Sequence, residues 1–207
     1  MSRVTRWWWI RHAPVTANEG RCYGQTDFPA DCGKREHFES LAKLLPRKSV
    51  WIVSPLRRTH DTARAIAEAG FPVPEPIVEK DLIEQHFGNW QGRTYEELRA
   101  SPESGYHRFW LAPAATVPPG GESFEHVMGR VAMAIERLNV THAGRDIVAV
   151  THGGTIRAAV AHALRLDPEA ALRLEIHNTH LTQLEHFAQT DRQPPAWRAL
   201  GINLPPR

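Results

Sequence analysis

Short apolar runs and amphipathic stretches alternate along the chain. The apolar runs at 7–10, 50–53 and 147–150 have the length and composition of buried strands. Between them, apolar positions recur at helical spacing near 38–45, over 58–68, over 123–138 and over 155–166. We expect further strands at 173–176, 181–187 and 197–202. These come without long helices between them, so part of the sheet should be antiparallel.

This alternation predicts an α/β fold, a three-layer α/β/α sandwich with a mostly parallel mixed sheet. We expect residues 1–207 to form a single domain. The segment 81–121 interrupts the pattern because it is rich in Gly and Pro, and it predicts a small loop-helix elaboration, a lid over the site. Trp7, Trp8 and Trp9 should point to alternate faces of their strand and pack the core.

Composition and charge narrow the class of protein. The chain is 42% hydrophobic and 23% charged, which is ordinary for a globular protein. A formal net charge of +2 gives no general basic field, so we expect no nucleic-acid partner. No apolar run has the length of a signal peptide's hydrophobic region or of a membrane span, so we expect a cytoplasmic protein with no membrane partner. Cys22 and Cys32 are expected to be free thiols.

Basic side chains follow three of the predicted strands. The first strand ends in Arg11-His12, the second in 54–58 (SPLRR), and the third in 151–154 (THGG). Because the carboxyl ends of parallel strands meet at one edge of a sheet, Arg11, His12, Arg57 and His152 should lie together. Arginine and helix N-termini favour phosphate, so the sequence predicts a phosphate site. We interpret Arg58 as a solvated side chain.

The ordered set of motifs resembles the histidine phosphatase superfamily, in its phosphoglycerate mutase-like branch. It comprises Arg11-His12, the SPLR segment with Thr59 and Thr62-Ala63, Glu84 within LIEQHFGNWQG, and the THGG segment. The resemblance implies that His12 is the nucleophile and becomes phosphohistidine, that Arg11, Arg57 and His152 hold phosphoryl oxygens, and that Glu84 protonates the leaving group. The substrate-binding residues would be Asn18, Thr16, Gly24, Gln25 and Gly153, and no metal or other cofactor is expected. Neighbouring cations would keep the nucleophilic imidazole neutral.

The chain departs from the family pattern directly after the nucleophile. Where the family usually has RHGET or RHGES, this sequence has Ala13, Pro14 and Val15. Ala13 stands where the family has a glycine, the residue that adopts a positive φ most readily. Val15 removes a hydroxyl, although Thr16 is adjacent. Pro14 replaces a carboxylate that serves mutases more than phosphatases, which disfavours mutase activity.

Two further segments resemble the alpha-ribazole phosphatase-like subgroup, namely 20–27 (GRCYGQTD) and 120–123 (GGES). We therefore expect a metal-independent phosphatase for a small-molecule phosphomonoester, with alpha-ribazole phosphate as a candidate, acting as a monomer or a homodimer. A mutase-type phosphotransferase and a non-catalytic phospho-ligand-binding protein remain alternatives. A metal hydrolase is disfavoured because the 12 histidines show no H-E-x-x-H spacing. The segment 86–121 has few lysines or arginines and several aromatic residues, so we expect a pocket beside the phosphate that is partly aromatic and not strongly cationic. Such a pocket predicts a ring-bearing substrate with one phosphate. The aromatic residues are Phe87, Trp90, Tyr95, Tyr106, Phe109 and Trp110.

Overall fold

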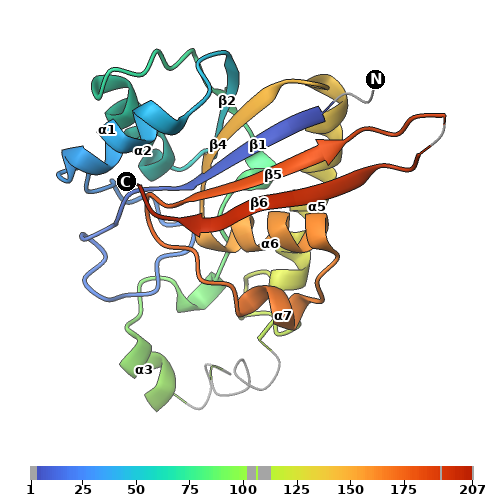
Figure 1. Cartoon of the computed structure of the whole chain (residues 1–207). Coiled ribbons are helices and arrows are strands. Elements are labelled where there is room, and N and C mark those ends of the chain that lie inside the picture. The colour runs from blue at the N-terminus through green and yellow to red at the C-terminus, as the bar shows by residue number, and fades with distance from the viewer. Residues whose placement is uncertain (1–3, 102–105, 107–112, 192, 207) are drawn as a thin grey trace.

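A mixed six-stranded sheet forms the centre of the protein (Figure 1). The computed structural model describes residues 4–101, 106, 113–191 and 193–206. The strand order is β3-β2-β4-β1-β5-β6. The strands are β1 (Val4–Arg11), β2 (Ser49–Val53), β3 (Ile77–Val78), β4 (Asp146–Thr151), β5 (Leu181–Phe187) and β6 (Ala196–Leu204). Strands β1 to β4 pair in parallel, whereas β5 and β6 pair antiparallel, which confirms the predicted mixed sheet.

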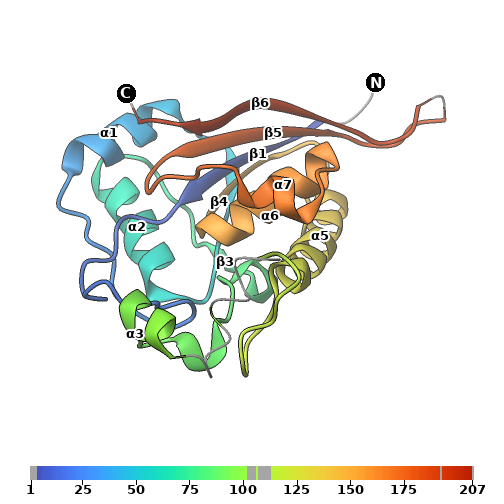
Figure 2. The ribbon, with the colours of Figure 1, turned by 90° about the horizontal axis from the view of Figure 1, so that it is seen from below.

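Helices cover both faces of this sheet (Figure 2). The first face carries α1 (Arg35–Leu44) and α2 (Arg57–Glu68), and the second carries α5 (Phe124–Thr141), α6 (Gly153–Leu164) and α7 (Pro168–Leu172). Each face has its own apolar cluster, one built on α1 and α2 and the other on α5 and α6. The three-layer α/β/α arrangement is thus the one the alternating pattern predicts.

The three consecutive tryptophans of β1 pack on both sides of the sheet, as expected for a strand. Trp7 and Trp9 are fully buried on the α5–α6 side, where their rings stack 4.6 Å apart. Trp8 packs against the α1–α2 side. The Trp7 indole Nε1 donates to Asn139 Oδ1 of α5 at 2.9 Å. These contacts fix β1 between the two helical layers.

The prediction of a strand at 173–176 is wrong. This stretch follows the short helix α7, which the sequence pattern did not reveal, and it runs in irregular conformation to the start of β5. Its carbonyl groups accept hydrogen bonds from two arginines instead of from a neighbouring strand. Arg157 Nε donates to Leu174 O at 2.7 Å, and Arg11 Nη1 donates to Ile176 O at 2.5 Å.

Loops and short helices alternate in the described part of the segment 81–121. It contains the short helices η1 (Lys80–Leu82, which begins one residue earlier), η2 (Gly88–Trp90) and α3 (Tyr95–Ala100). Trp90 is 2% exposed and packs on Cys22, Leu98 and Tyr106, so it belongs to a small core of its own. Phe109 and Trp110 lie outside the described residues. A lid function for this segment stays a prediction.

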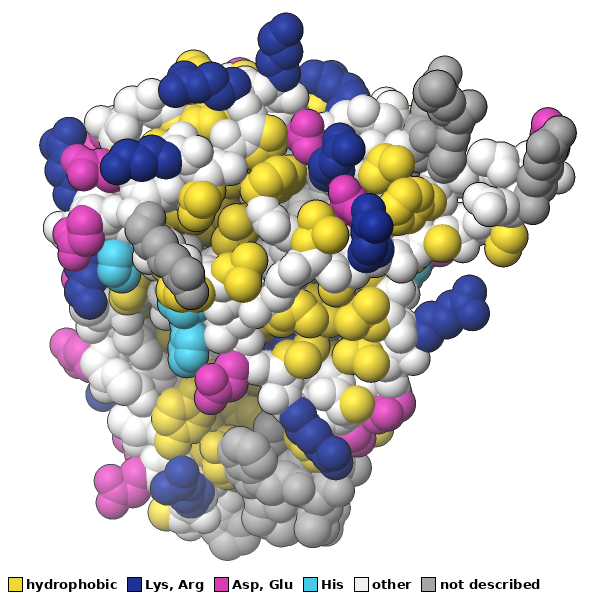
Figure 3. Space-filling model, in the orientation of Figure 1, with side chains coloured by type: hydrophobic (Ala, Val, Ile, Leu, Met, Phe, Trp, Pro, Cys, Tyr) yellow, Lys and Arg dark blue, Asp and Glu magenta, His cyan; other side chains and the backbone are white. Residues whose placement is uncertain are grey.

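Hydrophobic side chains gather over the middle of one face (Figure 3). Exposed leucines on the edge strand β6 include Leu200 and Leu204.

Within the described ranges, no helix has both the length and the apolar character needed to cross a bilayer. Both cysteines are free, and burial raises the pKa of each thiol to about 11.

Candidate functional site

The carboxyl ends of β1, β2 and β4 bring two histidines together, as the strand pattern predicts. His12 follows β1 and His152 follows β4, and their rings lie 5.2 Å apart. The two residues are 1% and 0% exposed. We refer to these two residues with Arg11 and Arg58 as the histidine cluster. It lies beside the N-termini of α2 and α6, where unpaired backbone N–H groups favour an anion.

The backbone around His12 fixes one tautomer of its ring. His12 Nδ1 lies 2.7 Å from Ala13 O, and because a carbonyl only accepts, Nδ1 carries the proton. The lone pair is therefore on Nε2. Burial lowers the pKa of His12 well below its ordinary value, and the charges of Arg58 and Arg11 lower this pKa further. His12 is thus a neutral imidazole with a free Nε2, which is the form that can attack phosphorus.

A turn before β5 holds the end of β1 in place. The Asn178 side-chain amide donates to His12 O at 2.7 Å, and Thr179 N donates to Arg11 O at 2.9 Å. Thr179 has a φ of 61°, in the left-handed region that a β-branched residue rarely adopts. The sequence analysis missed Asn178, since this turn has no motif that marks it.

The structure places Arg58, and not Arg57, in the histidine cluster. The expectation that Arg57 lies with the histidines and the interpretation of Arg58 as a solvated side chain are therefore both wrong. Arg58 is 0% exposed and donates from Nε to His152 Nδ1 at 3.3 Å. Its other nitrogens donate to Gly24 O at 2.6 Å and to Thr26 O at 3.0 Å. The Arg57 side chain is 61% exposed and pairs with Asp61 at 3.3 Å. Because neighbouring helix residues point about 100° apart, only one of the two can face the cluster.

His152 is also held as a neutral ring. Because arginine only donates, His152 Nδ1 accepts from Arg58, and Nε2 carries the proton toward Ser54 Oγ at 2.7 Å. Burial lowers the pKa of His152 well below its ordinary value, with smaller contributions from His12 and Arg58. Ser54, at the end of β2, therefore supports the second histidine.

Glu84 is held against the start of α6 by two threonines. Thr151 Oγ1 donates to Leu82 O at 2.7 Å, and Thr155 Oγ1 donates to Ile83 O at 3.1 Å. A side chain at Gly154 would place its Cβ 2.6 Å from Glu84 Oε1, so a glycine is needed for this approach. The Glu84 carboxylate acts electrostatically on Arg58 and Arg157, which places its charge beside the histidine cluster.

The residues predicted to bind substrate occupy three different places. Gly153 begins α6 next to the Arg11 guanidinium, and Arg11 Nε is buried without a partner in the described part of the chain. Gly24 and Gln25 hold other residues of the site, since Gly24 O accepts from Arg58 and Gln25 Nε2 donates to Glu84 O at 2.8 Å.

Asn18 and Thr16 lie in the loop that follows β1. The Asn18 side chain donates to Arg21 O at 2.9 Å, and Thr16 is exposed. Their contacts with a phosphate stay a prediction.

Ala13 does not require the backbone freedom of glycine. It is fully buried, is not among the residues with positive φ, and its N–H donates to Thr62 Oγ1 at 2.8 Å. The departure from the family pattern at this position is therefore compatible with the geometry of His12.

A pocket of about 440 Å³ adjoins Glu84. Besides Glu84 and Gly154 it is lined by Phe87, Phe124, Arg157 and Arg173, among others. Arg157 lies one turn after Gly153 on α6. A Cβ at Gly153 would lie 3.5 Å from Arg11 Nε and 3.7 Å from Arg157 Nη1, so both guanidinium groups approach the start of the helix. The sequence analysis missed Arg157, although its spacing of four residues from Gly153 puts the two on one helix face.

No group of three or more His, Cys, Asp or Glu side chains in the described ranges is arranged to hold a metal ion. The donors that surround the histidine cluster are mostly cationic or neutral, and such a set suits an anion.

Comparison with known proteins decides the family. The model of the histidine phosphatase superfamily (branch 1) matches residues 7–194. The chain belongs to this superfamily. The fold is similar to a solved structure titled mycobacterial hydrolase 2, with a TM-score of 0.84 and 28% sequence identity. The match covers 100% of this chain and 93% of that structure's chain.

Three curated relatives carry phosphatase names. The glucosyl-3-phosphoglycerate phosphatase of Mycolicibacterium vanbaalenii is 34% identical over 214 residues, which cover 98% of this chain and 93% of the relative. The metal-independent phosphoserine phosphatase of Arabidopsis thaliana is 33% identical, with coverages of 76% and 68%. The adenosylcobalamin/alpha-ribazole phosphatase of Salmonella typhimurium is 29% identical, with coverages of 81% and 83%. Other matched relatives, from mycobacteria, are longer, and the alignment spans 51% of their length.

Proposed function

We propose that this protein is a metal-independent phosphomonoesterase that works through a phosphohistidine on His12 Nε2. The observation that carries the proposal is the state of His12, a buried neutral ring whose Nδ1 proton is bound by Ala13 O. Arg11, Arg58 and His152 surround it and supply countercharge and hydrogen bonds for a phosphoryl group.

The reaction then has two steps. In the first, the Nε2 lone pair forms a bond to phosphorus while the P–O bond to the leaving group breaks, and protonated Glu84 gives its proton to the departing oxygen. In the second, water attacks phosphorus, Glu84 accepts the water proton, and the P–N bond breaks to return neutral His12. Gly154 leaves the space in which Glu84 can approach the cluster.

The pocket beside Glu84 bears on the substrate. We expected a pocket that is partly aromatic and poor in cations, an expectation that rested on the segment 86–121. Phe87 from that segment does line the pocket, but Arg157 and Arg173 come from α6 and the end of α7, outside it. The polarity of this pocket therefore differs from the expectation.

Two substrate classes follow from this lining. Phe87 and Phe124 suit a ring-bearing body, for which alpha-ribazole phosphate is the candidate from the motifs and the Salmonella relative. Arg157 and Arg173 favour a leaving group that carries a carboxylate, as the phosphoserine and glucosyl-3-phosphoglycerate named for two relatives do. We place both classes above bisphosphates, and Pro14 still disfavours mutase activity.

Hydrolysis of p-nitrophenyl phosphate after treatment with a chelator tests the proposal. The wild type should be active without added metal, and His12→Ala should lose turnover because no other group can accept the phosphoryl. Rapid acid-free quenching with labelled substrate should trap phosphate on His12. An inactive wild type that still binds phosphate would favour the non-catalytic binding protein instead.

A matched substrate pair separates the two substrate classes. Phosphoserine and phosphoethanolamine differ only by a carboxylate, so the wild type should prefer phosphoserine if Arg157 reads that group. Arg157→Met should remove the preference and leave the rate on p-nitrophenyl phosphate within about threefold. Alpha-ribazole phosphate turned over faster than phosphoserine would favour the ring-bearing class.

A further inference from the structure

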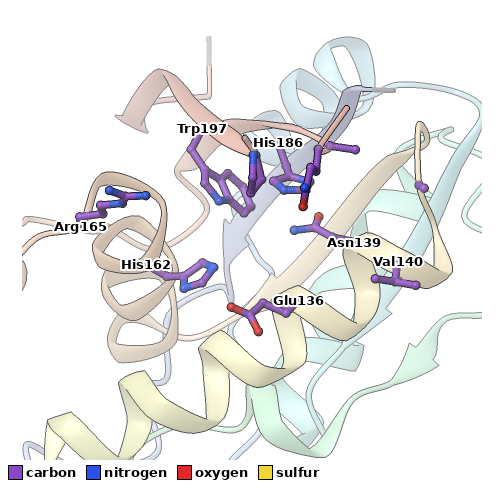
Figure 4. A pocket seen from close by; sticks show the side chains of 11 residues that line it. Glu136, Asn139, Val140, His162, Arg165, His186 and Trp197 are labelled. Atoms are coloured by element: carbon purple, nitrogen blue, oxygen red, sulfur yellow. The ribbon is translucent and has the colours of Figure 1, made fainter. Parts of the chain in front are cut away.

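The protein has a second pocket, of about 590 Å³, which Figure 4 shows from close by. It is formed by the last turns of α5 and α6 and by the hairpin of β5 and β6. His162 of α6 lines it, whereas Gly153, at the other end of the same helix, lies next to Arg11 of the histidine cluster. At 1.5 Å per residue, these two positions are roughly 14 Å apart along the helix axis.

One wall of this second pocket is made of uncharged aromatic rings. Trp197 of β6 lies 4.8 Å from the His186 ring and 5.7 Å from the His162 ring, centre to centre. Burial lowers the pKa of both histidines, so both are neutral at physiological pH. Val140, which is 81% exposed, stands among the lining residues. Such a wall suits a flat ring better than a flexible chain.

The other wall carries a hydrogen-bond donor beside an acceptor. Asn139 Oδ1 accepts from the Trp7 indole, which can only donate, so the orientation of the amide is fixed and its NH2 group faces the pocket. Glu136, three residues earlier on α5, points its carboxylate into the same space toward His162 (Figure 4). The Glu136 charge acts electrostatically on His162, and within the described ranges its carboxylate forms no ion pair.

We propose that this second pocket binds a planar nitrogen heterocycle whose edge presents N–H donors beside a carbonyl oxygen, as a guanine base does. The ring would lie against Trp197, its N–H groups would donate to Glu136, and its carbonyl would accept from Asn139. Residues three apart on a helix have Cβ atoms about 5–6 Å apart, which matches the width of such an edge. The proposal does not depend on the phosphatase function.

Calorimetric titration of the full chain with nucleosides tests the proposal. Nucleosides have no phosphate, so they do not engage the histidine cluster. Guanosine should bind saturably at one site per chain. Inosine, which lacks the exocyclic amine, should bind more weakly. Adenosine, which presents a ring acceptor to Glu136, should bind at least about tenfold more weakly than guanosine.

Glu136→Gln should weaken guanosine binding by about tenfold or more, because it removes the charge from the acceptor. Glu125→Gln is the matched control, since Glu125 is exposed on the same helix and does not line the pocket. Both variants should hydrolyse p-nitrophenyl phosphate at the wild-type rate, or keep the wild-type melting temperature if the wild type is inactive, which shows that they are folded. No saturable binding up to several millimolar, equal affinity for guanosine and adenosine, or unchanged affinity in Glu136→Gln would each overturn the proposal.

Discussion

Arg58 donates its Nε hydrogen to Nδ1 of His152 at 3.3 Å, and this bond joins the start of α2 to the start of α6. Two backbone carbonyls, of Gly24 and Thr26, bind the rest of the guanidinium. Within the described ranges no carboxylate forms an ion pair with Arg58, and Glu84 and Asp27 act on it only through longer-range electrostatics, so it can also attract a bound anion.

Substitution of Arg58 should affect hydrolysis far more than substitution of its neighbour Arg57. Arg58→Ala should lower kcat/KM for p-nitrophenyl phosphate by about 100- to 1000-fold, as expected for loss of one preorganised electrostatic contact. Arg57→Ala should change it less than about threefold, since the Arg57 side chain is 61% exposed and does not reach the histidine cluster. Arg58→Lys covers the case in which Arg58→Ala does not fold, and a lysine cannot make all three bonds. Equal losses in the Arg57 and Arg58 variants would contradict this assignment.

Glu84→Gln should separate substrates by their leaving group. The rate on alkyl phosphates should fall by about 100-fold or more, because an alkoxide needs a proton as it leaves. The rate on p-nitrophenyl phosphate should fall much less, since nitrophenolate leaves without one. Steady-state rates on both substrates with the same enzyme give the comparison. Equal losses on the two would point to another carboxylate, such as Glu122, as the acid.

The two buried histidines should make the protein less stable in acid. Their pKa values are lowered by folding, so below pH 6.5 the unfolded chain binds protons that the folded chain does not. The free energy of unfolding is therefore retained above pH 6.5 and falls as the pH drops below it, by at most about 1.4 kcal/mol per histidine per pH unit. Urea denaturation at pH 7.5, 6.5 and 5.5 measures the slope. The slope below pH 6.5 should be smaller in His152→Asn, and an unchanged slope would refute this origin.

Inorganic phosphate should stabilise the folded protein. It would neutralise the arginines of the histidine cluster, and at 100 times its dissociation constant it should add about 2.7 kcal/mol. For a chain of this size, that corresponds to a rise in Tm of roughly 5–10 °C. Thermal unfolding in phosphate and in sodium chloride of equal ionic strength makes the comparison. Arg58→Ala should remove most of the difference, and a similar rise in chloride would show that only ionic strength acts.

The sequence alone was enough to predict which strand ends meet. The β1, β2 and β4 ends could be found because each buried strand is a distinct apolar run followed by polar residues. The choice between Arg57 and Arg58 failed because it depends on the rotational phase of α2. That phase was in fact readable, since the buried residues Thr62, Ala65 and Ile66 lie four, seven and eight positions after Arg58.

Other parts of the site depend on contacts between segments far apart in the chain. Asn178 reaches His12 from 166 residues away, and Arg157 is turned toward the site by a carbonyl in an irregular stretch. Neither contact has a periodic pattern or a motif. The same carbonyl bonds explain why 173–176 does not form the strand that its apolar residues suggested.

Thr179 connects the stability of this protein to the placement of its histidine. The left-handed backbone of Thr179 costs on the order of 1–3 kcal/mol. It persists because Thr179 N donates to Arg11 O and the Asn178 side-chain amide donates to His12 O. A glycine at this position would relieve the strain, but it would also raise the conformational entropy of the unfolded chain. The strain at this turn is therefore the local cost in stability of holding the His12 imidazole in place.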